Sequence, residues 1–186
     1  MKKTFGLILA IVAIIIIWGI AKYNSFVKAE EQMTQAWSQV ENVYQRRMDL
    51  IPNLIAVVKT YSDYESGTLV EVVEARAQQA ASVTVSPESM TQEQLSSFEN
   101  TQQLLGEAVN DVMVSIEAYP DLKAVEAYQT FMAQYVGCEN RIMVERRRYN
   151  EQVQAYNKSI RSFPAKYIAQ WFGFEKKPYF NASADD

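Results

Sequence analysis

The fold of this 186-residue chain is decided by residues 125–163, VEAYQTFMAQYVGCENRIMVERRRYNEQVQAYNKSIRSF. Large side chains recur there at every third or fourth position: Val125, Tyr128, Met132, Tyr135, Glu139, Ile142, Arg146, Tyr149, Val153, Tyr156, Ile160 and Phe163. This spacing places them along one face of an α-helix. The stretch therefore predicts one long helix that packs against neighbouring helices in the manner of a coiled coil.

Three earlier segments carry similar apolar seams. They consist of Tyr23, Phe26, Glu30, Met33, Trp37, Val40, Tyr44 and Arg47; of Leu54, Val57, Val58, Tyr61, Glu65, Leu69, Val72 and Arg76; and of Leu95, Phe98, Leu105, Val109, Val112, Ile116 and Tyr119. No window shows the strict alternation of a half-buried strand. We therefore expect an all-α protein, with an antiparallel up-and-down bundle of about four long helices.

Local signals suggest where these helices begin and end. Asp49 is expected to cap a second helix that has Pro52 in its first turn, although Pro52 could instead kink one very long helix. The later signals are a connector at 82–89, a helix start at Ser89 or Thr91, a cap at Asp121 and a stop at Pro164. With four helices the chain returns to the end where it started, whereas with three it finishes at the far tip.

The N-terminal segment, residues 5–21, is uncharged and almost wholly aliphatic. As a helix it would reach about 25 Å, at the short end for crossing a bilayer. A cleaved signal peptide is the other interpretation, but no convincing small-x-small cleavage site follows. We expect an uncleaved anchor that continues into the first bundle helix. Lys2 and Lys3 favour an N-terminus inside the cell and a bundle outside the inner membrane of a bacterium.

Composition excludes several classes of site. The chain has no histidine and one cysteine, Cys138, which removes Ser–His and Cys–His nucleophile pairs, imidazole metal ligands and internal disulfides. Its six glycines form no phosphate-binding loop, and its net charge of −4 argues against nucleic acid as a partner. Glu71 and Glu74 could hold a metal in principle, but without histidine they are expected to be a solvated face. We expect no catalytic residue, cofactor or metal.

Five charged residues fall on the apolar seams: Arg47, Glu65, Arg76, Glu139 and Arg146. A buried charge is costly unless it is paired and hydrogen-bonded. We expect a network of ion pairs that fixes helix register, in which Glu65 or Glu139 contacts one of the arginines across the bundle. The alternative is a polar ligand site inside the bundle.

Residues 164–186 form an aromatic and basic tail. Lys166, Tyr167, Trp171, Phe172 and Phe174 give it the composition of a short interfacial helix that could lie on the membrane surface. The same apolar face could equally pack against the base of the bundle.

A series of ordered motifs resembles the LemA family of bacterial membrane proteins. They are Arg47-Met-Asp-Leu-Ile-Pro-Asn-Leu54, Tyr61 with Glu65, Val73-Glu-Ala-Arg76, Tyr119-Pro-Asp-Leu-Lys-Ala124, Glu139-Asn140, Arg146-Arg-Arg-Tyr-Asn150, Tyr156-Asn157, Ser162-Phe-Pro164, Phe172-Gly-Phe174 and Pro178-Tyr-Phe180. The resemblance covers residues 20–180 and implies a helical bundle behind one N-terminal span. It implies no reaction. The asparagines of these motifs could bridge helix backbones or share an interaction face.

Three segments are expected: an anchor at 1–21, a LemA-like bundle at 22–163 and the tail at 164–186. Since no catalytic constellation is present, the leading hypothesis is a membrane-anchored, non-enzymatic scaffold or adaptor of the envelope. It would bind protein partners or copies of itself. The alternative is a sensory or ligand-binding bundle with a buried polar site.

Overall fold

A computed structural model describes residues 2–60, 67–83 and 85–181 of the chain. The helices are α1 (Lys2–Thr60), α2 (Gly67–Ser82), α3 (Gln92–Ile116), α4 (Pro120–Lys123), α5 (Glu126–Arg161) and α6 (Lys166–Trp171). The described ranges contain helices and no strand. The predictions of an all-α fold and of a long apolar N-terminal helix that continues into the bundle are confirmed.

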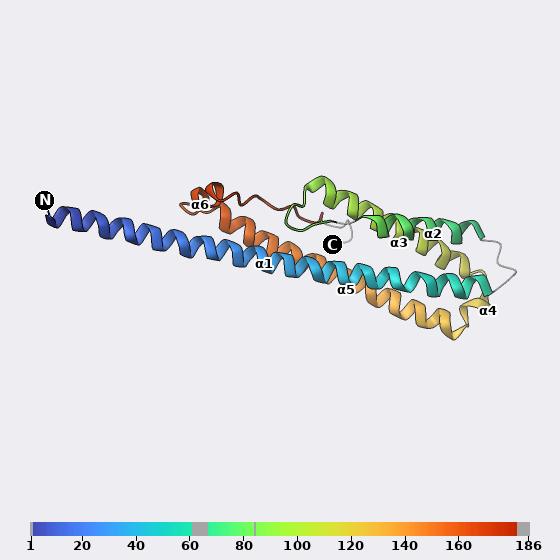
Figure 1. The fold of residues 1–186 in the computed structure, drawn as a ribbon. Helices are drawn as coiled ribbons and strands as arrows, with labels where there is room; N and C mark the ends of the chain where they lie inside the picture. The colour runs from blue at the N-terminus through green and yellow to red at the C-terminus, as the bar shows by residue number, and fades with distance from the viewer. Residues whose placement is uncertain (1, 61–66, 84, 182–186) are drawn as a thin grey trace.

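The helices form an elongated bundle from which the N-terminal part of α1 projects (Figure 1). The chain reverses after α1, after α2 and again at α4, so α5 runs back beside α1 toward the end from which α1 projects. Backbone contacts are densest between α1 and α5 and between α2 and α3. The chain after α5 therefore returns to its starting end, although α2, with 16 residues, is much shorter than α1 and α5.

The predicted helix boundary at Asp49 is wrong, because α1 continues through Pro52 as far as Thr60. Pro52 is exposed, while Ile51 and Leu54 beside it are buried and keep the seam in phase with Tyr44. Burial on both sides of the proline offsets the backbone hydrogen bond that it removes. One long helix through Pro52 was the alternative that the sequence allowed. Residues 61–66 lie outside the described residues.

The sequence also predicts where the next two bundle helices begin, at Ser89 or Thr91 and at Asp121. Thr91 opens α3 with a complete capping box, in which its hydroxyl accepts from the Gln94 amide and Gln94 accepts from the Thr91 amide. This start is confirmed. The cap predicted at Asp121 is wrong, since Asp121 lies within the four-residue helix α4 and Val125 precedes α5. Pro120 starts this separate turn because its fixed φ suits a first helical position.

The core consists of two clusters of buried side chains. The large one runs through the bundle and includes Trp37, Leu105 and Tyr149, all of them almost fully buried. The small one lies at the base, where Phe26 of α1 and Tyr156 of α5 meet Ala165 and Ala169. The seam of α5 is buried as predicted over most of its length, but Phe163 at its end is 77% exposed.

Candidate functional site

Arg47 forms the centre of a polar cluster that joins three helices. Its side chain is 5% exposed, and its Nη1 donates to Glu139 Oε1 of α5 at 3.0 Å. Its Nη2 donates to Gln102 of α3, at 2.5 Å to Oε1 and 2.7 Å to the backbone oxygen. The guanidinium also lies 5.2 Å from the centre of the Tyr44 ring. Both Nη atoms are thus engaged within the protein.

Arg146 makes a second link, to a residue that the sequence did not point to. Its Nη2 lies 2.5 Å from Glu99 Oε1 of α3, and both side chains are largely buried. Burial raises the pKa of the Glu99 carboxyl above its ordinary value of 4.5, and Arg146 and Asn181 lower it by less. Glu99 precedes Thr101 and Gln102 and lies off the predicted seam, so only the fold brings it to Arg146.

The four predicted network residues that the structure describes thus do not form one cluster. Arg47 and Glu139 meet, Arg146 pairs with Glu99, and Arg76 donates to Gln79 three positions along its own helix at 3.0 Å. Glu65 lies outside the described residues.

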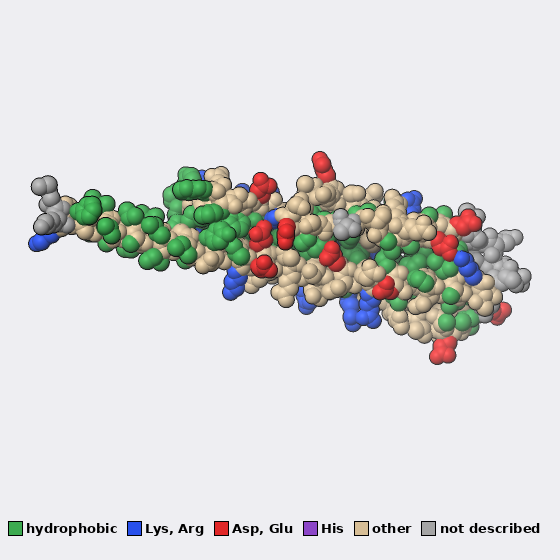
Figure 2. All heavy atoms as spheres, in the orientation of Figure 1, with side chains coloured by type: hydrophobic (Ala, Val, Ile, Leu, Met, Phe, Trp, Pro, Cys, Tyr) green, Lys and Arg blue, Asp and Glu red, His purple; other side chains and the backbone are tan. Residues whose placement is uncertain are grey.

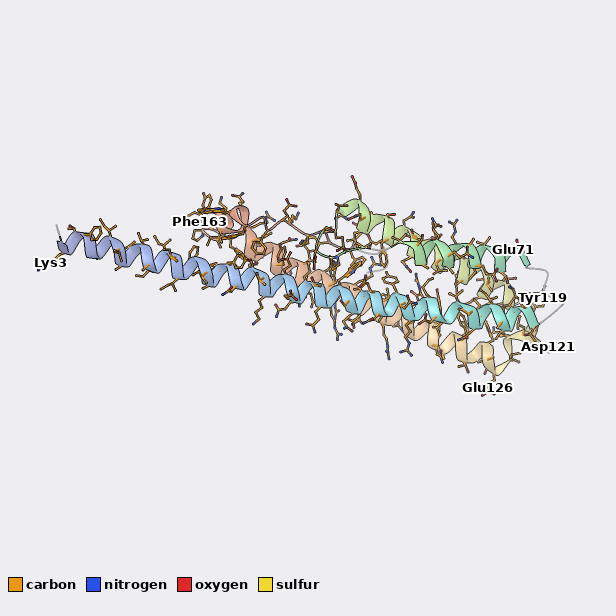
Figure 3. All side chains as sticks on the ribbon, viewed as in Figure 1. Lys3, Glu71, Tyr119, Asp121, Glu126 and Phe163 are labelled. Atoms are coloured by element: carbon orange, nitrogen blue, oxygen red, sulfur yellow. The ribbon has the colours of Figure 1, made fainter. Side chains whose placement is uncertain are left out.

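A surface hollow of about 500 Å³ lies elsewhere, between Asn53, Val57, Glu126 and Phe131. None of the four predicted charged residues that the structure describes (Arg47, Arg76, Glu139 and Arg146) lines this hollow. It opens at the end of the bundle that carries Tyr119, Asp121 and Glu126 (Figure 3). The polar residues of the core therefore do not form the wall of a cavity there.

One carboxylate of the α2 pair, that of Glu74, forms an ion pair between helices. Glu74 Oε1 lies 2.6 Å from Lys59 Nζ at the end of α1. Glu71 is exposed at the end of the bundle opposite to Lys3 (Figure 3). Among the described residues, no three Asp, Glu or Cys side chains gather in a group that could hold a metal ion.

The opposite end of the molecule is apolar and exposed. From Phe5 to Ile20, the large hydrophobic side chains of α1 other than Trp18 are 47% to 68% exposed, and this part of α1 is a candidate membrane span. Figure 2 shows hydrophobic side chains covering the projecting part of α1 and the adjacent α6. The two surfaces adjoin at the base of the bundle.

α6 packs against α1 where the candidate span ends. Ile168 Cδ1 would lie 3.9 Å from a methyl group added at Gly19. The rings of Phe172 and Phe174 lie 4.9 Å and 5.6 Å from that of Tyr23. Ala165 and Ala169 are buried against the small core cluster. One face of α6 therefore packs on the base of the bundle, as one of the two interpretations required.

The other face of α6 is exposed. Trp171 is 88% exposed, and Tyr167, Phe172 and the preceding Phe163 are each more than half exposed. Lys166 Nζ lies 5.0 Å from the centre of the Tyr167 ring. Figure 3 places Phe163 at the end of the bundle from which α1 projects, far from Tyr119. These aromatics form an apolar surface beside the candidate span.

The rest of the tail turns away from this end. After α6 it runs back along the bundle toward its middle (Figure 1). There the side chains of Asn157 and Asn150 of α5 hydrogen-bond to the backbone of Lys177 and Phe180, so these asparagines bridge helix and tail. The sequence indicated the asparagines through their motifs, but it did not indicate Lys177 or Phe180 as their partners.

Comparison with known proteins gives two findings. A model of the LemA family matches residues 36–186. The magnetosome protein MamQ 2 of Paramagnetospirillum magneticum is 27% identical over 175 residues, covering 86% of this chain and 64% of the relative. The magnetosome protein MamQ of Magnetospirillum gryphiswaldense is 26% identical over 176 residues, with 86% and 65% covered. The chain thus spans about 64% of the length of the curated relatives it matches.

Proposed function

Since this chain belongs to the LemA family, we propose that it is a membrane-anchored, non-enzymatic scaffold of the bacterial envelope. Residues 1–21 are the anchor and residues 22–163 are the bundle. In the tail, α6 lies on the membrane surface, and the residues after it pack along the bundle. The observation that carries the proposal is the continuity of α1. One helix runs from the exposed apolar segment into the buried seam at Phe26, Met33 and Trp37. The bundle is therefore a rigid extension of the span.

α6 provides the second attachment to the bilayer. Its exposed aromatics adjoin residues 18–23 of α1, where the span meets the headgroup region. Tryptophan, tyrosine and lysine favour that region. Two attachments, one through the bilayer and one on its surface, would restrict the tilt of the bundle.

The polar cluster supports a scaffold in preference to the ligand-binding alternative. Both Nη atoms of Arg47 are occupied by groups of α3 and α5. A ligand would have to displace these partners from a buried guanidinium. The cluster fixes the register of three helices instead. The positive N-terminal flank supports a bundle on the outer side of the inner membrane.

Site-specific photo-crosslinking in cells tests the scaffold. Val136 and Met143 are half exposed or more on α5, so a photoreactive residue placed there faces outward. Glu41 on α1 is an exposed control. We expect the same partner, or the chain itself, to be captured repeatedly at Val136 or Met143 and confirmed by reciprocal capture. Capture that does not differ from Glu41, or no capture at any site, would contradict a scaffold.

Quenching of tryptophan fluorescence tests, independently of the crosslinking, whether α6 lies on the membrane surface. The full chain is reconstituted in vesicles that contain lipids with a quencher at a shallow or a deep position. The difference in fluorescence between the wild type and Trp171→Phe reports on Trp171. We expect shallow quenchers to act most strongly and aqueous iodide weakly. Quenching by iodide without quenching by either lipid would show that α6 lies off the membrane.

A further inference from the structure

The segment Lys177–Asn181, called here the tail segment, is bound by the bundle in the way that a receptor binds an extended peptide. Asn157 Nδ2 donates to the Lys177 oxygen at 2.8 Å, and the Lys177 amide donates to Asn157 Oδ1 at 2.9 Å. Seven residues earlier in α5, about two helical turns away, Asn150 makes the same two bonds with Phe180, at 3.1 Å and 2.9 Å. Each asparagine therefore binds both backbone groups of one tail residue.

These hydrogen bonds involve only backbone groups of the tail segment, so they do not select for its sequence. Two of its side chains do add sequence selectivity. Phe180 is 3% exposed and stacks on Trp37, with centroids 5.8 Å apart and planes at 15°. Tyr149 meets its ring edge-on at 5.4 Å, and the Arg146 guanidinium lies 4.8 Å from its centre. The receptor therefore provides a closed aromatic pocket with a cation on one side.

Lys177 occupies a second pocket. Its side chain is 8% exposed, and its Nζ lies 3.2 Å from Glu30 Oε1 of α1. Nζ also donates to the backbone oxygen of Glu88 and lies 6.0 Å from the centre of the Tyr156 ring. Beyond Phe180, Arg146 donates to the Asn181 oxygen at 3.1 Å, and Asn181 Nδ2 donates to Glu99 Oε2 at 3.0 Å. The tail segment thus links α1, α3 and α5.

We propose that this seam is a peptide-binding site whose resident ligand is the chain's own tail segment, and that it accepts the tail segment of a second copy. A bound segment taken from another copy makes the same contacts, so exchange has little cost beyond the connection that must open. That connection, residues 172–176, is non-helical and mostly exposed, and it contains Gly173 at φ +75°. To open, it must release the rings of Phe172 and Phe174 from Tyr23. The partner is a second copy because every copy carries both pocket and ligand.

The membrane makes this exchange geometrically simple. The inference rests on the proposed anchoring, which orients all copies alike and holds every tail segment and every seam at the same height above the bilayer. Confinement to one surface also raises the effective concentration of one copy near another.

Crosslinking between two tagged full-length copies tests exchange. Both carry Cys138→Ser, since the buried Cys138 thiol donates to the Val43 oxygen at 3.2 Å and a hydroxyl can replace it. One copy carries Asn181→Cys, the other Glu99→Cys, and both are reconstituted together and treated with a short bismaleimide. A single chain with both cysteines should crosslink within itself and so validates the geometry. We expect a crosslinked heterodimer as well.

Three matched controls separate exchange from collision. Phe180→Ala on the Asn181→Cys copy should lower the heterodimer yield by at least about tenfold, because the aromatic anchor is lost. Asn150→Ala with Asn157→Ala on the Glu99→Cys copy should do the same. Replacing Glu99→Cys by Glu117→Cys, at the exposed far end of α3, should give no heterodimer. Circular dichroism checks that each variant is folded.

The yield of the crosslinked heterodimer, compared with its controls, shows whether tail segments exchange between copies. Crosslinking within the double-cysteine chain, but none between copies, would overturn exchange and leave the tail segment as an internal strap. Equal yields with Glu117→Cys would also overturn it. Flotation of the same vesicles reports membrane anchoring separately, so failed exchange is distinguishable from a failure of the proposed function.

Discussion

Arg47 of α1 bonds to Glu139 of α5 and to Gln102 of α3, and its substitution tests whether this cluster fixes the register of the three helices. Replacing it by methionine would remove its ion pair with Glu139 and leave the buried Gln102 side chain without its donor. We expect Arg47→Met to lower the free energy of unfolding by about 2–4 kcal/mol. Arg46→Met, at an exposed neighbour, should change it by less than about 0.5 kcal/mol. Urea denaturation of both variants checks this, and equal effects would contradict a structural role for the cluster.

Glu99 gives a prediction about pH. Burial raises its pKa in the folded protein above the ordinary 4.5, so the folded state binds a proton more tightly than the unfolded state. Stability contributed by this group therefore rises as pH falls from neutrality through the folded pKa toward 4.5. We expect the wild type to gain stability relative to Glu99→Gln over that interval. Denaturation midpoints measured from pH 7 downward would contradict this if the difference were constant or reversed.

At the scale of single elements, Pro52 carries a cost that α1 tolerates. It lies exposed inside the helix, where proline removes a backbone hydrogen bond and crowds the preceding turn. Pro52→Ala should therefore stabilise the bundle by about 1–3 kcal/mol. Thermal unfolding measures it, with Asn53→Ala at the adjacent exposed position as control. A lower melting temperature in Pro52→Ala would show that a bend at this position is required for packing.

The asparagines of α5 give a second prediction at this scale. Asn157→Ala leaves the buried amide and oxygen of Lys177 without partners, which should cost about 2–4 kcal/mol. Asn140→Ala, at an exposed position of the same helix, should be neutral or slightly stabilising. Hydrogen exchange localises the effect, and we expect the Lys177 and Phe180 amides to lose protection first. Unchanged protection at both amides would contradict the assigned contacts.

At the scale of the whole molecule, the continuity of α1 predicts how far the bundle rises above the membrane surface. From residue 22 to Thr60 the helix is about 58 Å long. Full-length protein in a supported bilayer should therefore rise about 55–60 Å above the lipid when examined by atomic force microscopy. Tyr167→Ser, Trp171→Ser and Phe172→Ser together should lower and broaden this height, because α6 no longer restricts tilt. A wild-type height of half this value or less would contradict an upright bundle.

Several features of the fold could be predicted because they depend on local spacing. The apolar period fixes which face of each helix is buried, and it correctly placed Trp37, Tyr149 and Tyr156 in the core. The capping box at Thr91 is likewise a property of four consecutive residues. The continuity of α1 also had a local signal, since Tyr44, Arg47, Ile51 and Leu54 stay in phase across Pro52. The prediction gave more weight to the proline than to this phase.

The candidate sites were less predictable, because their partners are distant in sequence. Glu99 is 47 residues from Arg146, and Lys177 is 20 residues from Asn157. Neither has a periodic signal that indicates its partner. For α6, the alternative of packing on the base of the bundle holds for one face, and the membrane-surface alternative stays a prediction. A six-residue helix can bury small residues on one side and expose aromatics on the other, and composition does not divide the two faces.

By itself, the sequence determined that this chain is a set of long helices led by an apolar segment, because apolar spacing and hydropathy act over a few neighbouring residues. Only the tertiary structure decided that Arg47 links α1, α3 and α5, that α6 lies beside the end of the candidate span, and that the tail segment fills the seam of the bundle. These are contacts between distant parts of the chain, and their free energy depends on surfaces that exist only after the helices have packed.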